Sequence, residues 1–395
     1  MTAHDRPDRP TVWASLSAGA LAIVVVGALV AISGGAAAMD RPLWLDEVVT
    51  LLVARAPQGI VHAMRSGVDF QPPPYYMLVR MVDGFGGMED TVAARLPSVV
   101  AAALTVALVG YTLRMRLSLA AALAGALALA AHPLFIGQVA EARPYALWIL
   151  ATAVTAECLR ANRRGAAVMT AIAAVALGTV HYFGILALTS LGLAVAAHAR
   201  LARRLSWPAV VRTVAPLAVG VAALIALLPL ARAQLEATGG RSYLPPATAD
   251  GIRVFLTFIW GWHPALILLS AGGLMCVAHR TPSLAARLPR AAPIKLDLSL
   301  LALLSTVGVP LLVVLVTLAY KPVLVLRYSA PAVLAMATCC ALAVESLPRA
   351  GRWLAVLLLV RSALFSFGSA TTAARAELAL FASEAQAVRQ LSALG

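Results

Sequence analysis

Residues 299–319 read SLLALLSTVGVPLLVVLVTLA and contain no charged side chain. A helix needs roughly 17–25 apolar residues to cross the hydrocarbon core of a bilayer, and this stretch of 21 residues is long enough. Ten further stretches have a similar character. The full set of predicted crossings covers residues 13–35, 92–112, 117–134, 144–160, 166–182, 183–199, 209–231, 253–279, 299–319, 326–345 and 351–369. The sequence therefore predicts a bundle of about eleven transmembrane helices.

The composition of the 395-residue chain leads to the same conclusion. Hydrophobic residues make up 61% of the chain and charged residues only 12%, whereas soluble domains carry about 25% charged residues. So few charges cannot cover the surface of a water-soluble protein of this length. The same composition excludes a disordered protein and a coiled coil. We therefore expect an all-α polytopic membrane protein without a soluble domain.

The basic residues are unevenly distributed about the predicted crossings. The formal net charge is +14, from 31 Lys and Arg against 17 Asp and Glu. With the N-terminus in the cytoplasm, the inner segments hold 17 of the basic residues but only five of the acidic ones. This bias satisfies the positive-inside rule. The charge therefore indicates membrane orientation, with the C-terminus outside, and no nucleic-acid partner is expected.

The longest predicted outer segment, residues 36–91, is expected to contain amphipathic helices. Apolar residues recur at helical spacing from Leu45 to Met64, with polar residues between them, and this pattern is typical of a helix lying in the membrane interface. Pro57 should kink or split that helix. A second short helix should follow the prolines at 72–74. We assign residues 1–369 to one transmembrane domain and residues 370–395 to a short outer tail.

Two adjacent carboxylates, Asp46 and Glu47, follow the first predicted crossing. Acidic residues at a membrane boundary are costly unless they are paired or face water. A carboxylate in this place could act as general base for an incoming hydroxyl group. The same two acids also suit the first turn of a helix, where the helix dipole favours negative charge. Position alone leaves both interpretations open.

A second polar group lies between the third and fourth predicted crossings and contains Glu141, Arg143 and Tyr145. It offers a carboxylate, a fixed cation and a hydroxyl at the outer mouth of the bundle. Pro144 suits the first turn of the following helix. The alternative is a capping segment with a surface Glu–Arg pair, which would contribute little energy. The residues alone do not decide between the two.

Further candidates lie near other outer helix ends. Arg327 and Tyr328 open the tenth crossing, where an arginine could bind a phosphate group or anchor the helix at the interface. His181 lies in the turn between the fifth and sixth crossings, and Tyr75 follows a rigid polar turn. Within that turn, Asp69 could bind a sugar hydroxyl or hold the turn together.

Metal and nucleotide motifs are absent from the sequence. The four cysteines fall in apolar stretches without CxxC spacing, and the histidines do not follow the ligand spacing of zinc sites. The sequence contains no GxxxxGK[ST] or GxGxxG motif, so it predicts no nucleotide site. No cofactor is expected; a divalent metal is compatible with the acidic residues but is not indicated.

Four short motifs follow one another in the first half of the chain. They read Leu45-Asp46-Glu47, Pro72-Pro73-Pro74-Tyr75-Tyr76, Ala94-Arg95-Leu96-Pro97-Ser98 and Glu141-Ala142-Arg143-Pro144-Tyr145-Ala146-Leu147. Taken in order, they resemble the bacterial relatives of the protein O-mannosyltransferases and the lipid A aminoarabinose transferases, integral-membrane glycosyltransferases of the GT-C fold. The similarity covers about residues 40–160, with Arg327-Tyr328 as a weaker local match.

This resemblance implies an inverting glycosyltransferase that moves a hexose or pentose from a polyprenyl-phosphate donor. The reaction would take place on the periplasmic or extracellular side of a bacterial inner membrane, without nucleotide or bound metal. Asp46 matches the family's general base, with Glu47 beside it, and Glu141 matches a further functional acid. The remaining matched residues would bind the donor phosphate or substrate: Arg143, Tyr145, Arg327, Tyr328 and Tyr75. His181, at an outer helix end, is a further candidate for substrate binding.

The acceptor stays open, since a lipid, a glycan or a protein hydroxyl would each fit. Many relatives continue into an outer domain that helps to select the acceptor, whereas this sequence ends in the tail at 370–395. The competing class is a transporter or flippase of polyprenyl-linked glycans, which should carry functional charges in mid-membrane. Nearly all acids here lie at predicted helix ends. An inactive scaffold of the same fold is the third interpretation.

Overall fold

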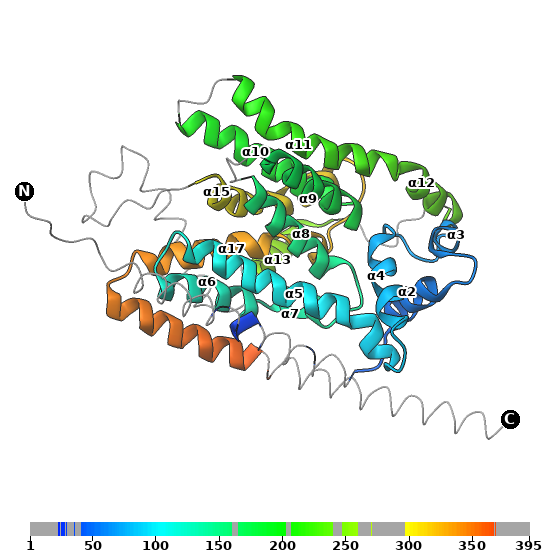
Figure 1. Cartoon of the computed structure of the whole chain (residues 1–395), viewed down its shortest axis with the longest axis horizontal. Coiled ribbons are helices and arrows are strands. Elements are labelled where there is room, and N and C mark those ends of the chain that lie inside the picture. Colours follow the sequence, from blue (N-terminus) through cyan, green and yellow to red (C-terminus); the bar gives the residue numbers. More distant parts are fainter. Residues whose placement is uncertain are drawn as a thin grey trace, which may run out of the picture.

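The computed structural model describes residues 41–159, 165–202, 207–239, 247–259 and 297–366, together with the single positions 23, 25–27, 29, 35, 270 and 368. All regular elements in this part of the chain are helices, as Figure 1 shows. The prediction of an all-α polytopic membrane protein is confirmed. Most of the crossings predicted at 13–35 and 253–279, and the tail at 370–395, lie outside the described residues.

Three of the described helical segments are long and apolar enough to span a bilayer, namely Asp90–Arg114 (α5), Val210–Ala237 and Leu298–Ala319. Two of these segments are each interrupted by a break in the helix. Val210–Ala237 falls in α11 (Trp207–Ala226) and α12 (Leu228–Ala237). Leu298–Ala319 consists of α15 (Leu298–Ser305) and α16 (Gly308–Ala319). The shorter apolar helices are α8 (Tyr145–Cys158), α9 (Ala166–Val180), α10 (Gly184–Ala202) and α17 (Ala332–Glu345).

One predicted crossing, residues 117–134, bends sharply before its end. The helix α6 (Leu119–Ala131) and the helix α7 (Pro133–Val139) meet at an angle of 66° and qualify as a fourth span only if counted together. Pro133 has no N–H group to continue the first helix, and the ring nitrogen Nδ1 of His132 accepts a hydrogen bond of 3.2 Å from the Leu134 N–H. The histidine therefore caps α7 at the break.

Apolar side chains remain exposed along the outside of the bundle. On α16, Leu311, Leu315 and Leu318 are 58%, 59% and 67% exposed. Their spacing places them on one face of the helix. Water would make such a face unfavourable, whereas lipid chains cover it at no cost. This is the surface expected of a protein that lies in a bilayer.

The helices pack in layers around α8 (Figure 1). On one side, α9 packs against α11 with little space between the two backbones, because a Cβ atom on Gly178 would lie 2.3 Å from the carbonyl oxygen of Gly220. Small residues allow this close approach, as in many membrane helix pairs. On the other side, α5 packs against α8, and α6 packs against α17.

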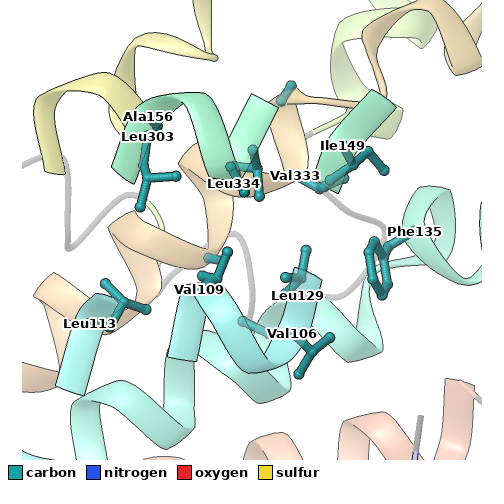
Figure 2. Packing of buried hydrophobic residues seen from close by; sticks show 14 of the residues in the cluster. Val106, Val109, Leu113, Leu129, Phe135, Ile149, Ala156, Leu303, Val333 and Leu334 are labelled. Carbon is teal, nitrogen blue, oxygen red and sulfur yellow. The ribbon is translucent and has the colours of Figure 1, made fainter. Parts of the chain in front are cut away.

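The main core lies between these layers, and Figure 2 shows part of it. Its members come from helices far apart in the sequence, including α5, α6, α8, α15 and α17. The labelled side chains are Val106, Val109, Leu113, Leu129, Phe135, Ile149, Ala156, Leu303, Val333 and Leu334. This apolar packing fixes the ends of α7 and α8, which carry the polar residues described below.

Three short helices cover one end of the bundle: α2 (Leu45–Arg55), α3 (Ile60–Arg65) and α4 (Pro74–Asp83). The predicted split at Pro57 is present, since the chain leaves helical conformation between α2 and α3. These helices enclose a second apolar cluster that includes Met64 and Tyr76, and α12 packs against α3. We call this the α2–α4 end (Figure 1).

Ion pairs tie the helices together at the opposite end of α5. Arg116 donates a hydrogen bond of 2.7 Å to Asp297 before α15 and lies 3.4 Å from Glu157 on α8. Glu345 at the end of α17 accepts a 2.9 Å hydrogen bond from the backbone N–H of Ser118, before α6. These contacts fix the relative positions of five helices and leave the α2–α4 end as the place where polar groups are less completely paired.

Candidate active site

The candidate site forms where four segments of the chain meet at the α2–α4 end. These are the first turn of α2, the turn that precedes α4, the segment between α7 and α8, and a short 3-10 helix, η2 (Leu326–Ser329). The apolar core holds the last two segments. The second apolar cluster holds the first two. Leu147 packs against both clusters and so links the two halves of the site.

Asp46, Arg143 and Asp69 form one group, which we call the open triad. The guanidinium Nη1 of Arg143 donates a hydrogen bond of 2.6 Å to Asp69 Oδ2, and its Nη2 lies 3.7 Å from Asp46 Oδ2. The side chains of Arg143 and Asp69 are 6% and 8% exposed, whereas that of Asp46 is 34% exposed. Asp46 is therefore the carboxylate that an incoming molecule can reach.

Glu47 and Arg95 form a different arrangement, which we call the closed pair, because both side chains are fully buried. Glu47 Oε1 accepts hydrogen bonds from Arg95 Nε at 2.8 Å and from the backbone N–H of Ala142 at 2.7 Å. Its Oε2 accepts from Arg95 Nη2 and from the Trp44 N–H. Both oxygens are thus occupied, and Glu47 holds in place the residue between Glu141 and Arg143.

Arg95 extends the closed pair to the chain before α2. Its Nη1 donates to the carbonyl oxygen of Arg41 at 2.6 Å and its Nη2 to that of Pro42 at 2.9 Å. One buried arginine on α5 therefore fixes the entry to α2 and the segment before α8 together. Asp46 occupies the first turn of α2, so its position is set by this arrangement.

Glu141 lies in the segment between α7 and α8, and its Oε2 is buried without a hydrogen-bond partner among the described residues. Burial raises the pKa of the Glu141 carboxyl above its ordinary value, and the neighbouring charge of Arg327 opposes this shift. The buried Oε2 is therefore an acceptor that a hydrogen-bond donor of a bound molecule could satisfy.

Arg327 in η2 lies against two aromatic rings. The centre of its guanidinium is 6.0 Å from the centroid of the Trp44 ring and 5.7 Å from that of Tyr145. Such contacts stabilise a cation, and they leave its hydrogen-bond donors for other partners. The Nε of Arg327 is buried and has no partner in the described part of the chain.

His181 lies in an aromatic group next to this arginine. Its ring stacks on Trp148 with a centroid distance of 4.7 Å and lies 5.2 Å from Tyr145 and 5.9 Å from Tyr328. Its Nδ1 accepts a hydrogen bond from the Phe183 N–H at 3.1 Å, so the proton of the neutral ring resides on Nε2. Burial, aided by nearby positive charge, lowers the pKa of His181 to about 3. His181 is therefore a neutral donor.

Tyr75 is linked to the backbone of Arg143 through Ser98. Its hydroxyl is 2.8 Å from Ser98 Oγ, which donates a hydrogen bond of 3.1 Å to the carbonyl oxygen of Arg143. The Tyr75 side chain is only 1% exposed. Tyr75 and Ser98 together fix the position of the Arg143 backbone.

Buried polar atoms without a partner are concentrated in this region. Most buried polar groups in proteins are hydrogen-bonded, so a cluster of exceptions indicates space for polar atoms of a ligand. Within the described residues the cluster contains Gln71 Oε1, Gln138 Oε1, Glu141 Oε2, Arg143 Nε, Tyr145 Oη, Trp148 Nε1, His181 Nε2, Arg327 Nε and Ser329 Oγ. N–H and O–H donors outnumber acceptors, as suits a ligand with phosphate or sugar oxygens.

Comparison with known proteins gives a result for the fold. No family model and no curated protein matches the chain. Among solved structures, ArnT from Cupriavidus metallidurans bound to undecaprenyl phosphate matches with a TM-score of 0.54 and 17% identity over 85% of this chain. The same ArnT in the apo state matches with a TM-score of 0.55 and 17% identity over 87% of this chain. The chain has the fold of ArnT.

These matches confirm the GT-C-like polytopic fold expected from the sequence motifs. At 17% identity the likeness concerns the fold alone. This chain also spans only 62% of the length of ArnT. The fold likeness therefore assigns no role to any single side chain of this protein.

The fold brings together most of the residues that the sequence singled out, and it adds others. Asp46, Glu141, Arg143 and Arg327 share one region with the aromatic group around His181. The added residues are Trp148, which stacks on His181, and Gln234, which bonds to the Asp69 turn. Arg95, which was expected only as part of a motif, pairs with Glu47. A single tryptophan or glutamine in an apolar helix carries no signal of its own, because its partners lie far away in the sequence.

A metal centre was not expected, and the described residues contain no group of three or more His, Cys, Asp and Glu side chains that could hold a metal ion. Three of the carboxylates at the site have arginine partners. Asp69 and Asp46 flank Arg143, while Glu47 is enclosed by Arg95.

Proposed function

We propose that this chain transfers a sugar from a polyprenyl-phosphate donor to the hydroxyl group of an acceptor. The main support is the cluster of buried, unpartnered polar atoms at the α2–α4 end of an otherwise apolar bundle. A donor of this class has matching parts, a long apolar chain and a polar phosphate sugar. The fold likeness to an ArnT structure bound to undecaprenyl phosphate is consistent with it.

The donor phosphate would be held by Arg143 and Arg327. Arginine binds phosphate with charge-assisted hydrogen bonds, and both side chains have a buried Nε without a partner among the described residues. When the bond between the anomeric carbon and the phosphate oxygen breaks, the electron pair leaves with the phosphate. Fixed cations stabilise this developing charge without reorganisation.

Asp46 is proposed as the general base. The acceptor oxygen attacks the anomeric carbon from the side opposite the phosphate, its proton passes to the Asp46 carboxylate, and the configuration at the anomeric carbon inverts. Asp46 is suited to this step because its side chain is the most exposed of the open triad and makes no hydrogen bond to Arg143. No nucleotide and no bound metal takes part in this scheme.

The two other acids receive different roles. Glu141 would contact the substrate, because its Oε2 is buried near Arg327 without a partner in the described chain. Glu47 was expected from the sequence to act in catalysis beside Asp46. Its two oxygens already accept four hydrogen bonds, so we assign it a positioning role, in which it holds Ala142 and the start of α2.

The remaining expected site residues act on the substrate or on other side chains. Tyr145, His181 and Tyr328 would line the sugar or phosphate position through the aromatic group, whereas Tyr75 would steady Arg143. By the charge distribution of the sequence, the α2–α4 end would face the periplasm or exterior of a bacterial inner membrane. The acceptor can be a lipid, a glycan or a protein.

The test is sugar release from a panel of polyprenyl-phosphate sugars by the purified chain. Wild type is measured beside Asp46→Asn, with Asp250→Asn as a control, because Asp250 is exposed and its ion pair is with Arg253, three residues away. We expect turnover of one donor by the wild type and the control but not by Asp46→Asn. Absence of turnover with every donor, despite binding of the lipid phosphate, would favour a carrier or an inactive scaffold.

A further inference from the structure

Asp69 belongs to no motif used above, yet its carboxylate is fully engaged. Oδ2 accepts hydrogen bonds of 2.6 Å from both Arg143 Nη1 and the Tyr76 hydroxyl, and Oδ1 accepts one of 2.8 Å from the Phe70 N–H. Burial and the adjacent carboxylate raise the pKa of Tyr76, so its hydroxyl keeps its proton and acts as donor. Asp69 is thus aimed at Arg143 by its own turn and by α4.

The turn that carries Asp69 is held in place from a distant part of the chain. Gln234 on α12 donates through Nε2 to the carbonyl oxygens of Asp69 at 3.0 Å and Gln71 at 3.3 Å. Its Oε1 accepts a hydrogen bond of 2.7 Å from the Tyr182 hydroxyl. One amide side chain therefore connects α12, the Asp69 turn and the turn between α9 and α10, where His181 lies.

Gln234 differs from the rest of α12. It is fully buried, whereas no other residue of this helix is. Burying an amide is costly unless its hydrogen bonds are made, and an apolar residue would fill the same space without that cost. The turn also approaches α12 closely at Gly67, where a Cβ atom would lie 2.9 Å from Ala237 Cβ. The hydrogen bonds from Gln234 therefore hold the Asp69 turn in one position, which an apolar side chain at this place would not do.

The position of the Asp69 turn matters because Asp69 is one of two carboxylates beside Arg143. Arg143 lies between two carboxylates and bonds to only one of them, because Asp69 is at 2.6 Å and Asp46 at 3.7 Å. If Asp69 moved away, the guanidinium of Arg143 could close the remaining distance and hydrogen-bond to Asp46. That hydrogen bond would weaken Asp46 as a base and draw the guanidinium away from a ligand phosphate.

We propose that Asp69 is a positioning residue that keeps Arg143 from hydrogen-bonding to Asp46, and that Gln234 is the positioning residue that fixes Asp69. This inference rests on the proposed function, since the roles of Asp46 and Arg143 come from it. We refer to the two residues as the Asp69–Gln234 contact.

The kinetic test compares Asp69→Asn and Gln234→Met with Glu236→Gln, an exposed change on the same helix. Asp69→Asn should lower kcat/KM about 100-fold, as expected when a phosphate-binding group is misplaced. It should also move the acidic limb of the pH–rate profile to lower pH, because Arg143 then lies closer to the proposed base. Gln234→Met should act in the same direction but less strongly, and Asp69→Glu should restore part of the activity.

Loss of rate with an unchanged pH profile would reject the positioning role, because a purely structural defect lowers the amount of active protein without moving the profile. A second measurement does not depend on activity. An experimental structure of Gln234→Met should show a longer separation of Asp69 and Arg143 and a shorter one of Arg143 and Asp46. An unchanged open triad in that variant would overturn the inference even if the protein transfers no sugar, so this failure can be told apart from failure of the proposed function.

Discussion

Two arginine–carboxylate groups lie within the same site and have opposite properties. In the closed pair, Glu47 and Arg95 are both fully buried, and Glu47 accepts hydrogen bonds on both oxygens. In the open triad, Arg143 bonds to Asp69, approaches Asp46 without bonding to it, and keeps an unpartnered Nε within the described chain. Arginine and carboxylate side chains thus form one group in which both carboxylate oxygens accept hydrogen bonds, and another that still has a hydrogen-bond donor for a ligand.

The difference shows why burial and pairing must be considered together. A buried ion pair whose hydrogen bonds are all made has no capacity for a substrate, and removing one partner leaves an uncompensated charge. A pair with unsatisfied donors is less favourable in the empty protein but can gain new partners on binding. We therefore expect changes in the closed pair to affect stability first and changes in the open triad to affect activity first.

The largest effect on activity is expected for Asp46→Asn. Loss of a general base lowers the rate about 10²–10⁴-fold, while the exposed side chain of Asp46 contributes little to folding. Initial transfer rates and the melting temperature in detergent should be measured on the same preparation. A large fall in melting temperature with this variant would contradict the separation of the two groups.

The largest effect on stability is expected for Arg95→Met. It leaves the Glu47 carboxylate buried without its partner, which costs about 3–5 kcal/mol. Denaturant or thermal unfolding of the purified protein measures this loss. Arg253→Gln is the matched control, because Arg253 and its partner Asp250 are 74% and 71% exposed and such pairs contribute about 0–1 kcal/mol. Equal losses in the two variants would show that the closed pair is not a structural centre.

Arg327→Ala should weaken donor binding more than acceptor use. A hydrogen bond to a charged group contributes about 1.5–3 kcal/mol, so the apparent donor affinity should fall roughly 10- to 100-fold. Separate titrations of donor and acceptor measure the two KM values, with exposed Arg232→Ala as control. If both KM values rise together, Arg327 does not act on the donor phosphate.

A smaller effect is expected on the pH dependence of stability through His181. Its pKa is about 3 in the folded protein and about 6.5 in an unfolded chain. Between these values only the unfolded state binds the proton, so stability falls as the pH is lowered from 6.5 toward 3, by at most about 1.4 kcal/mol per unit. Melting temperatures of His181→Gln should show a weaker slope than wild type, and exposed His62→Gln an unchanged one.

Chelation should have no effect on turnover. The described residues provide no cluster of metal ligands, and the proposed chemistry uses the arginines of the site as its cations. Rates with and without a chelator test this expectation. A loss of activity that one added metal ion restores would mean that the open triad, or residues near it, hold a metal.

The sequence predicted helices well where a long apolar stretch coincides with one helix, as in α5, α8, α9 and α10. It was less accurate where a single stretch contains two elements. Residues 117–134 bend at His132, and the stretch at 326–345 begins with the short η2 before α17. Hydropathy measures how apolar a segment is and contains no information on the direction of its axis, so such breaks are not visible in it.

The candidate site was predicted in composition but not in geometry. Asp46 and Glu47 are neighbours, and the resemblance implied related roles for both. On a helix, consecutive side chains point about 100° apart, so one of them faces Arg95 and the other faces Arg143. Which acid is enclosed depends on where α5 and the segment before α8 pack, and that is decided by contacts 48 and 95 residues away from Glu47.

The amino-acid sequence by itself determined that this chain is an apolar helical bundle, which way its charges orient it, and which polar residues lie near helix ends, because these properties depend on local composition and spacing. The tertiary structure alone decided which polar groups are complete and which remain open. Pairing requires two groups to meet in a low-dielectric interior, and the partners of Glu47, Asp69 and Gln234 include residues from distant segments of the chain that only packing brings together.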